Sequence, residues 1–166
     1  MYSIKMKLHM DMTKLDLDEV IIIKSKQWLY SYREQLEWMA QNLKDTDMHV
    51  ILRKDEKDVA YLNLIDLNIF VDNKIVSCWG IGNVCAVERG KGFGYEIMKE
   101  INKYINNSVR MGLLYCKPKL LNFYSNLNWI ELSRNNHIKV SEELKAMVLN
   151  LELSKNTILE YDGQIF

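Results

Sequence analysis

A glycine-rich segment after an apolar run is the part of this sequence whose residue types and spacing best suit chemistry. The run Val84–Val87 leads into Arg89–Gly94, which reads R-G-K-G-F-G and places a glycine at every second position. Glycine allows a tight turn and a close approach of the backbone to a ligand, because no Cβ stands in the way. Where such a turn opens a helix, the first amide N–H groups lack internal partners and favour an anion. The segment therefore predicts a phosphate-binding turn.

The residues after this turn repeat with the period of an amphipathic helix. Apolar residues fall on one face at three- and four-residue intervals: Phe93, Ile97, Met98, Ile101, Tyr104 and Ile105. This spacing predicts one buried stripe on a helix, with charged residues on the other side. The predicted unit is a strand, a glycine turn and a helix.

The glycine spacing distinguishes between known phosphate motifs. A Walker A loop, G-x-x-x-x-G-K-[ST], is absent, and a dinucleotide G-x-G-x-x-G would need glycine where Tyr95 stands. The pattern that fits is R-x-x-G-x-G, formed by Arg89, Gly92 and Gly94. By itself this pattern is also compatible with a plain strand-to-helix turn.

A second motif lies further along, at Asn122–Trp129, which reads N-F-Y-S-N-L-N-W. Together the two motifs resemble the GNAT superfamily of N-acetyltransferases over about Val59–Leu132. The glycine segment is similar to the acetyl-CoA pyrophosphate loop of that family, and the second motif is similar to its F-Y-x-x-L-G-[FW] sequence. Asn128 replaces the glycine, and asparagine also tolerates the left-handed conformation that such a helix end needs.

The resemblance implies a fold, a co-substrate and a reaction. The expected fold is α/β, a single GNAT-like domain over residues 1–166. Its mixed, mostly antiparallel sheet of six to seven strands is splayed between the fourth and fifth strands and flanked by about four helices. The expected co-substrate is acetyl-CoA, and the expected reaction moves acetyl to a primary amine, most simply on a small molecule.

The resemblance also assigns the acetyl-CoA contacts. Backbone groups expected to bind pantetheine and the acetyl carbonyl belong to Gly82, Asn83 and Val84. The pyrophosphate is expected at the phosphate turn and its charges: Arg89, Gly90, Lys91, Gly92, Phe93, Gly94 and Tyr95. Lys117 stands where many members have an asparagine that contacts CoA, and its cation could reach a phosphate instead.

Tyr124 aligns with the tyrosine that commonly protonates the departing CoA thiolate in this family. Without the motif, a tyrosine on the inner stripe of a helix would be expected to be a core residue. The general base is less clear, because the strand segment 78–83 lacks the glutamate that several members carry. A water chain, Asp66 or an acid on the first helices are the alternatives.

Within the family, Leu64–Trp129 most resembles the aminoglycoside 2′-N-acetyltransferases, and the end of the chain, Tyr161–Phe166, is similar to their aromatic-x-x-G-x-[VI]-aromatic terminus. That likeness makes the carboxylate of Phe166 a candidate base or amine anchor. Gly80 and Gln164 replace two acids of those enzymes, so the resemblance does not imply the drug as substrate.

The remaining pattern predicts the elements that position these residues. Expected strands are Ser3–Met10, Met48–Lys54, Val59–Val71, Lys74–Val87, Leu113–Cys116, Trp129–Leu132 and Met147–Leu153. Expected helices are Leu15–Ser25, Gln27–Leu43, the helix after Gly94 and one from Pro118 to Asn128. Gly112 is expected to be the C′ glycine of the third helix.

Composition limits the function classes. The 166 residues carry 22 basic and 22 acidic side chains, so no strong field would attract nucleic acid or a membrane surface. Three cysteines without C-x-x-C spacing predict neither disulfides nor a metal site, and reduced thiols suit a cytoplasmic protein. A nucleophilic Cys85 with His49 or His137 as base is disfavoured, because a buried strand cysteine is usually inert. A homodimer is left open.

Two other functions are compatible with the same residues. A protein or peptide N-acetyltransferase would present an open acceptor groove in place of a pocket. A non-catalytic acyl-CoA-binding or sensor module would explain the missing strand glutamate.

Overall fold

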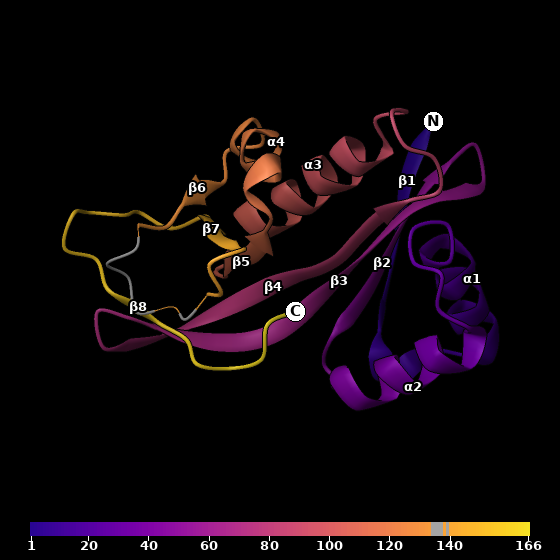
Figure 1. The fold of residues 1–166 in the computed structure, drawn as a ribbon, viewed down its shortest axis with the longest axis horizontal. Helices are drawn as coiled ribbons and strands as arrows, with labels where there is room; N and C mark the ends of the chain where they lie inside the picture. Colours follow the sequence, from indigo (N-terminus) through magenta and orange to yellow (C-terminus); the bar gives the residue numbers. More distant parts are fainter. Residues whose placement is uncertain (134–137, 139) are drawn as a thin grey trace. The chain divides into compact units, whose positions relative to one another are not determined.

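The computed structural model describes residues 1–133, 138 and 140–166, which form a mixed α/β fold (Figure 1). The helices are α1 Lys14–Lys24, α2 Tyr32–Asn42, α3 Phe93–Asn106 and α4 Leu121–Ser125, with 3-10 turns at His9–Asp11 and Pro118–Leu120. The strands are β1 Tyr2–Leu8, β2 Met48–Lys54, β3 Lys57–Val71, β4 Lys74–Ala86, β5 Met111–Cys116, β6 Ile130–Glu131, β7 Lys145–Leu149 and β8 Leu159–Glu160.

The strands hydrogen-bond in the order β1-β2-β3-β4-β5-β7-β6, and β8 pairs with β3. The strand beyond the predicted six to seven is the two-residue β8, while β6, predicted as Trp129–Leu132, is also only two residues long. Strand β4 pairs with β5 in parallel, and α3 is the crossover that a parallel pair needs. The register runs only from Cys78↔Met111 to Ile81↔Leu114, although β4 continues to Ala86. This confirms the predicted splay between the fourth and fifth strands.

The chain divides into two compact units, and each is made of two segments. Unit 1 contains residues 1–65 and 83–100, and unit 2 contains residues 66–82 and 101–166. Strands β3 and β4 and helix α3 run from one unit into the other. The turn between these strands, Asp72-Asn73, has φ angles of 49° and 63°, which suit the asparagine and aspartate found there.

In unit 1, α1 and α2 lie side by side next to the sheet (Figure 1). Their buried side chains form one core with residues of β2, β3 and β4: Val20, Ile21, Ile23, Met39, Leu43, Ile51, Tyr61 and Cys85. Thr13 caps α1 in a capping box with Asp16. The second helix begins at Tyr32 and not at the predicted Gln27, because Ser31 and Glu34 form another capping box.

A chain of hydrogen bonds is buried in the same unit. His49 Nε2 lies 2.9 Å from His9 Nδ1, and His49 Nδ1 lies 2.7 Å from the hydroxyl of Tyr61. Tyr61 is fully buried. Burial, with the nearby charges of His9 and Lys24, lowers the pKa of His49 to about 3.

Unit 2 packs β5 and β7 into a second core with Ile69, Cys78 and Leu159. Gly112 is not the predicted helix cap, since α3 ends at Asn106 and Gly112 lies in β5 opposite Leu149. A Cβ at Gly112 would come within 2.7 Å of the Trp129 ring, so the glycine makes room for that indole.

The helix predicted from Pro118 to Asn128 is shorter than expected. It consists of the 3-10 turn and α4, which ends at Ser125. Asn128 has a φ of 66°, which confirms the predicted left-handed conformation. The last long strand is Lys145–Leu149 and not Met147–Leu153, because the pairing of β7 with β5 ends at Gly112↔Leu149.

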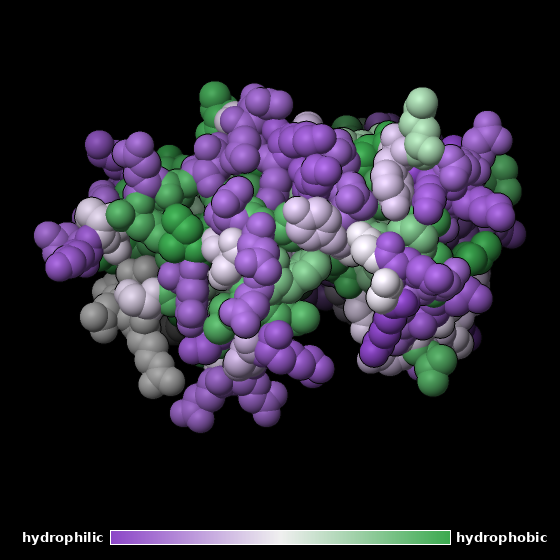
Figure 2. Space-filling view, turned by 90° about the horizontal axis from the view of Figure 1, so that it is seen from above, coloured by the Kyte–Doolittle hydropathy of each residue, from purple (hydrophilic) through white to green (hydrophobic). Residues whose placement is uncertain are grey.

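The face shown in Figure 2 is covered largely by hydrophilic side chains, with hydrophobic ones in small separate patches. Among the residues that the structure describes, no helix has the length and apolar character needed to cross a bilayer. The same residues contain no cluster of three side chains able to hold a metal ion.

Candidate functional site

The phosphate turn, Arg89–Gly94, lies in unit 1 between β4 and α3. Gly90 and Gly92 have φ angles of 76° and 77°, a region that L side chains rarely adopt. Apart from the chain neighbours and the backbone of α3, no atom of the described residues lies within 4 Å of the position that a Cβ would take at Gly90, Gly92 or Gly94. The turn is therefore open on the side where a ligand backbone could approach.

The first turn of α3 supplies the amides for an anion. Glu96 N donates to Gly92 O at 3.0 Å, which starts the hydrogen-bond ladder of the helix. The N–H groups of Phe93, Gly94 and Tyr95 precede that bond, and an α-helix offers no internal acceptor to such groups. Phe93 itself is buried and holds the start of the helix in the core. The strand, glycine turn and helix thus follow one another as the sequence predicts.

The two cations of the turn are exposed, and one of them is oriented by a partner. Arg89 Nε donates to Gln27 Oε1 at 2.9 Å, and Gln27 Nε2 donates to Ala86 O at 2.7 Å. Gln27 therefore links the guanidinium to the end of β4. Sequence reasoning missed Gln27, because it lies 62 residues from Arg89 and follows no motif.

Strand β4 has an unusual backbone at Asn83, whose φ is 53°. A residue other than glycine in this region inside a strand is strained, and such strain is frequent at functional sites. The Asn83 side chain donates to Oδ1 of buried Asn63 at 2.9 Å, which holds the conformation. Val84 follows as a half-buried strand residue. Asn63 was not predicted.

A pocket of about 440 Å³ lies in unit 1, and we refer to it as the tryptophan pocket. Its lining comes from α1, the loop after it, α2 and β4: Lys24, Trp28, Tyr30, Glu34, Gln35, Trp38 and Asn83. Asn83 is the predicted site residue that faces it. The other lining residues follow no motif.

In unit 2, Tyr124 lies on α4 and is 6% exposed. Burial, with a smaller contribution from Cys116, raises the pKa of Tyr124 to about 12. The phenol is therefore protonated at neutral pH and able to donate a proton. Lys117 is exposed immediately before the 3-10 turn that leads to α4.

Unit 2 also brings Gly82 and Phe166 together. A Cβ at Gly82 would lie 3.3 Å from the backbone carbonyl carbon of Phe166, and a Cβ at Gly80 would clash with the Phe166 ring. The ring centroid lies 5.3 Å from that of Tyr115. The glycine at position 80 thus leaves room for the phenylalanine ring.

Solved structures with the same fold are numerous, whereas no family model and no curated protein matches the chain. An acyl-CoA N-acyltransferase from Pseudomonas aeruginosa has 17% identity and a TM-score of 0.62, over 90% of this chain and 99% of that one. The N-acetyltransferase PseH of Campylobacter jejuni in complex with acetyl coenzyme A has 17% identity and a TM-score of 0.58, over 89% and 98%. The ribosomal-protein-S18-alanine N-acetyltransferase of Escherichia coli has 13% identity and a TM-score of 0.60, over 94% and 97%.

This chain has the GNAT fold. At these identities the likeness establishes the fold alone. The predicted family resemblance is therefore supported at the level of architecture, over nearly the whole length of the chain.

Two of the carboxylates considered as general bases, Asp66 and Asp16, are already paired with cationic side chains. Asp66 accepts from Arg110 Nη1 at 2.6 Å, and the Arg110 guanidinium lies 4.1 Å from the centre of the Trp79 ring. Asp16 bonds Lys5 and Lys7, which hold the pKa of its carboxyl well below the usual range. These two carboxylates are poorly placed to accept a proton from an amine.

The cysteine nucleophile is also disfavoured by the structure. Burial raises the pKa of Cys85 to about 12, so its thiol is neutral at physiological pH. His49 bonds Tyr61 and His9. His137 lies outside the described residues.

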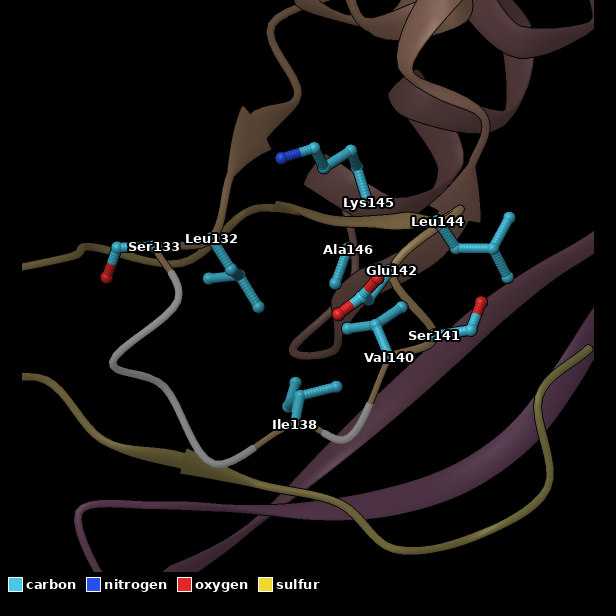
Figure 3. A pocket seen from close by; sticks show the side chains of 9 residues that line it. All are labelled: Leu132, Ser133, Ile138, Val140, Ser141, Glu142, Leu144, Lys145 and Ala146. Atoms are coloured by element: carbon cyan, nitrogen blue, oxygen red, sulfur yellow. The ribbon is translucent and has the colours of Figure 1, made fainter.

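A larger hollow of about 550 Å³ lies in unit 2 and contains none of the predicted site residues (Figure 3). The side chains of Leu132, Ile138 and Val140 point toward one another there. Lys145, at its edge, pairs with Glu131 at 3.3 Å. Its polar lining residues, Ser133, Ser141, Glu142 and Lys145, belong to neither of the two motifs found in the sequence.

Proposed function

We propose that this protein is an acetyl-CoA-dependent N-acetyltransferase that transfers acetyl to the primary amine of a small molecule. The observation that carries the proposal is the phosphate turn, with left-handed Gly90 and Gly92 opening directly into α3. A solved structure of this fold, that of PseH, is a complex with acetyl coenzyme A.

The proposed contacts follow the chain from β4 into α3. The amides of Gly90–Tyr95 bind the pyrophosphate, Arg89 and Lys91 add positive charge, and Lys117 contacts a phosphate. The backbone of Gly82–Val84 binds the pantetheine and the acetyl carbonyl. Support comes from the β4–β5 pairing, which ends at Ile81 and leaves these residues beyond the last pair.

The proposed chemistry is direct transfer. The amine nitrogen forms a bond to the thioester carbonyl carbon while the C–S bond breaks. Tyr124 donates its phenolic proton to the CoA sulfur, a role that rests on the motif around it, and burial keeps the phenol in its protonated form. The amine gives up a proton to a base, and a carboxylate at Phe166 is our candidate, since its carboxyl carbon adjoins Gly82.

The size of the tryptophan pocket, about 440 Å³, favours a small acceptor over a protein segment. Peptide acetylation remains the second candidate, because one enzyme of this fold is named for an alanine of a ribosomal protein. The sequence resemblance to aminoglycoside 2′-N-acetyltransferases would instead make the acceptor an aminosugar with several amino groups. The cytoplasmic location and the absence of nucleic-acid and membrane partners remain predictions.

Calorimetric titration with acetyl-CoA, CoA, ATP and NAD tests the proposal. We expect micromolar binding of the two CoA species alone, followed by thiol release when amines are added. Failure of a folded sample to bind CoA would reduce the phosphate turn to a structural feature. Binding without turnover on any amine would favour the sensor module.

A further inference from the structure

We propose that the tryptophan pocket selects an acceptor that carries an anionic group as well as its amine, namely a small amino-acid-like zwitterion with an apolar body. This inference rests on the proposed function and names the substrate class of that site. Three observations, all within unit 1, support it.

The first is a buried cation without a carboxylate. Lys24 is 5% exposed, and its ammonium lies 4.5 Å from the ring centre of Trp38 and 6.0 Å from that of Trp28. Over residues 1–133, 138 and 140–166, no carboxylate lies within ion-pair distance of Lys24. Burial of an unpaired ammonium is costly, and the ring faces offset only part of that cost. A substrate carboxylate would complete the pairing.

The second is a buried acceptor without a donor. Gln35 is 2% exposed, and its Oε1 is buried and unpartnered within the described residues. Its Nε2 donates to Ser25 Oγ at 2.9 Å and to Tyr30 O at 3.4 Å. Because a backbone carbonyl can only accept, these bonds fix which amide atom is the oxygen. A substrate N–H group would satisfy that oxygen.

The third is the shape and position of the lining. Trp28, Tyr30 and Trp38 provide flat apolar walls. Glu34 accepts from Ser31 N at 2.7 Å as part of the helix cap, so its carboxylate is already engaged. Asn83 belongs both to this lining and to the β4 stretch proposed to bind the acetyl group, which connects the pocket to the reaction.

The buried positive charge of Lys24 argues against polycationic acceptors. A buried ammonium at Lys24 would repel an aminoglycoside or a polyamine. The pocket and the sequence resemblance to aminoglycoside acetyltransferases therefore point to different substrates, and an experiment can decide between them.

The test compares L-phenylalanine, L-leucine and L-methionine with their carboxamides and with spermidine, by calorimetry and by thiol release with acetyl-CoA. We expect kcat/KM for at least one acid to exceed that of its amide by at least about tenfold. The Lys24→Met variant should lose this preference, and Lys26→Met, which removes an exposed cation nearby, should keep it. Lys24→Gln serves as a second variant if Lys24→Met does not fold.

Equal values for every acid and its amide, a preference for spermidine, or no binding of any acid would overturn the inference. Retention of the preference in a folded Lys24→Met protein would also overturn it. A separate acetyl-CoA titration distinguishes the two proposals. If the acids bind and acetyl-CoA does not, the pocket assignment stands and the proposed function fails.

Discussion

Unit 1 and unit 2 contribute different kinds of group to the proposed reaction. Unit 1 contains binding features, namely the phosphate turn and a pocket whose lining includes Lys24, without a carboxylate partner in the described residues, and Gln35, whose Oε1 lacks a donor there. Unit 2 contains Tyr124, a buried phenol with a raised pKa. The difference teaches that affinity and turnover should separate by mutation, with changes in the phosphate turn of unit 1 acting on affinity and a change at Tyr124 of unit 2 acting on turnover.

The largest expected effect is on affinity, through Gly94→Asp in unit 1. Gly94 has open space at its Cβ position and an ordinary φ, so the free protein should accept the side chain, and a carboxylate at a helix N-terminus is favourable. Repulsion of the pyrophosphate should weaken acetyl-CoA binding by at least about 100-fold in calorimetry. Gly94→Asn, similar in size but neutral, should lose much less. Wild-type affinity in Gly94→Asp would remove the phosphate role of the turn.

The second effect is on turnover, through Tyr124→Phe in unit 2. Loss of the proton donor should lower kcat by about 10- to 100-fold and leave acetyl-CoA affinity within about twofold. Tyr104→Phe, which changes a partly exposed tyrosine of α3, is the matched control. An unchanged kcat would show that another group protonates the thiolate, and the division of labour between the units would then fail.

The third effect is on stability and concerns the acid sensitivity of unit 1. The pKa of His49 is about 3 in the folded protein and about 6.5 when unfolded, so between these values the unfolded chain binds one proton more. Stability contributed by neutral His49 is therefore lost as pH falls below 6.5, by about 1.4 kcal/mol per pH unit. Urea unfolding at pH 7, 6 and 5 should show this slope, and His49→Gln should flatten it. The same slope in both proteins would contradict the assignment.

The smallest effect compares one buried hydroxyl in each unit. The hydroxyl of Tyr61 in unit 1 bonds His49, whereas that of Tyr115 in unit 2 is buried and unpartnered within the described chain. Tyr115→Phe should raise the free energy of unfolding by about 1 kcal/mol, and Tyr61→Phe should lower it by about 1 kcal/mol. Denaturant titration measures both. Destabilisation by Tyr115→Phe would mean that its hydroxyl has a partner in solution.

Features set by local spacing were predictable from the sequence. The phosphate turn depends on glycines within six residues, and the left-handed Asn128 follows from a motif with a helix end. The start of α2 was also recoverable, since Ser31 and Glu34 have capping-box spacing, but the apolar pattern before them suggested a longer helix. Local chemistry is thus visible in one sequence even where an element boundary is misjudged.

Features set by contacts between distant segments were not predictable. Gln27 reaches Arg89 across 62 residues. The position of Gly112 after a predicted helix suggested a helix cap. The reason for a glycine there is the Trp129 ring, which packs against β5 where a Cβ would lie. Whether Lys24 and Gln35 find partners likewise depends on which side chains the fold places next to them. Residue spacing along the chain does not predict this.

The interleaved segments of the two units have a consequence for synthesis. The core of unit 1 includes Cys85 together with Val20, Met39 and Tyr61, which lie in the other segment. A ribosome therefore releases the first 65 residues well before the strand that completes their core. The α1–α2 layer can already pack on Ile51 and Tyr61, but the part of its core that Cys85 fills stays open while residues 66–82 of the other unit emerge. Because unit 1 ends at Glu100, the order of translation supplies all of its residues before residues 101–166 of unit 2 are made.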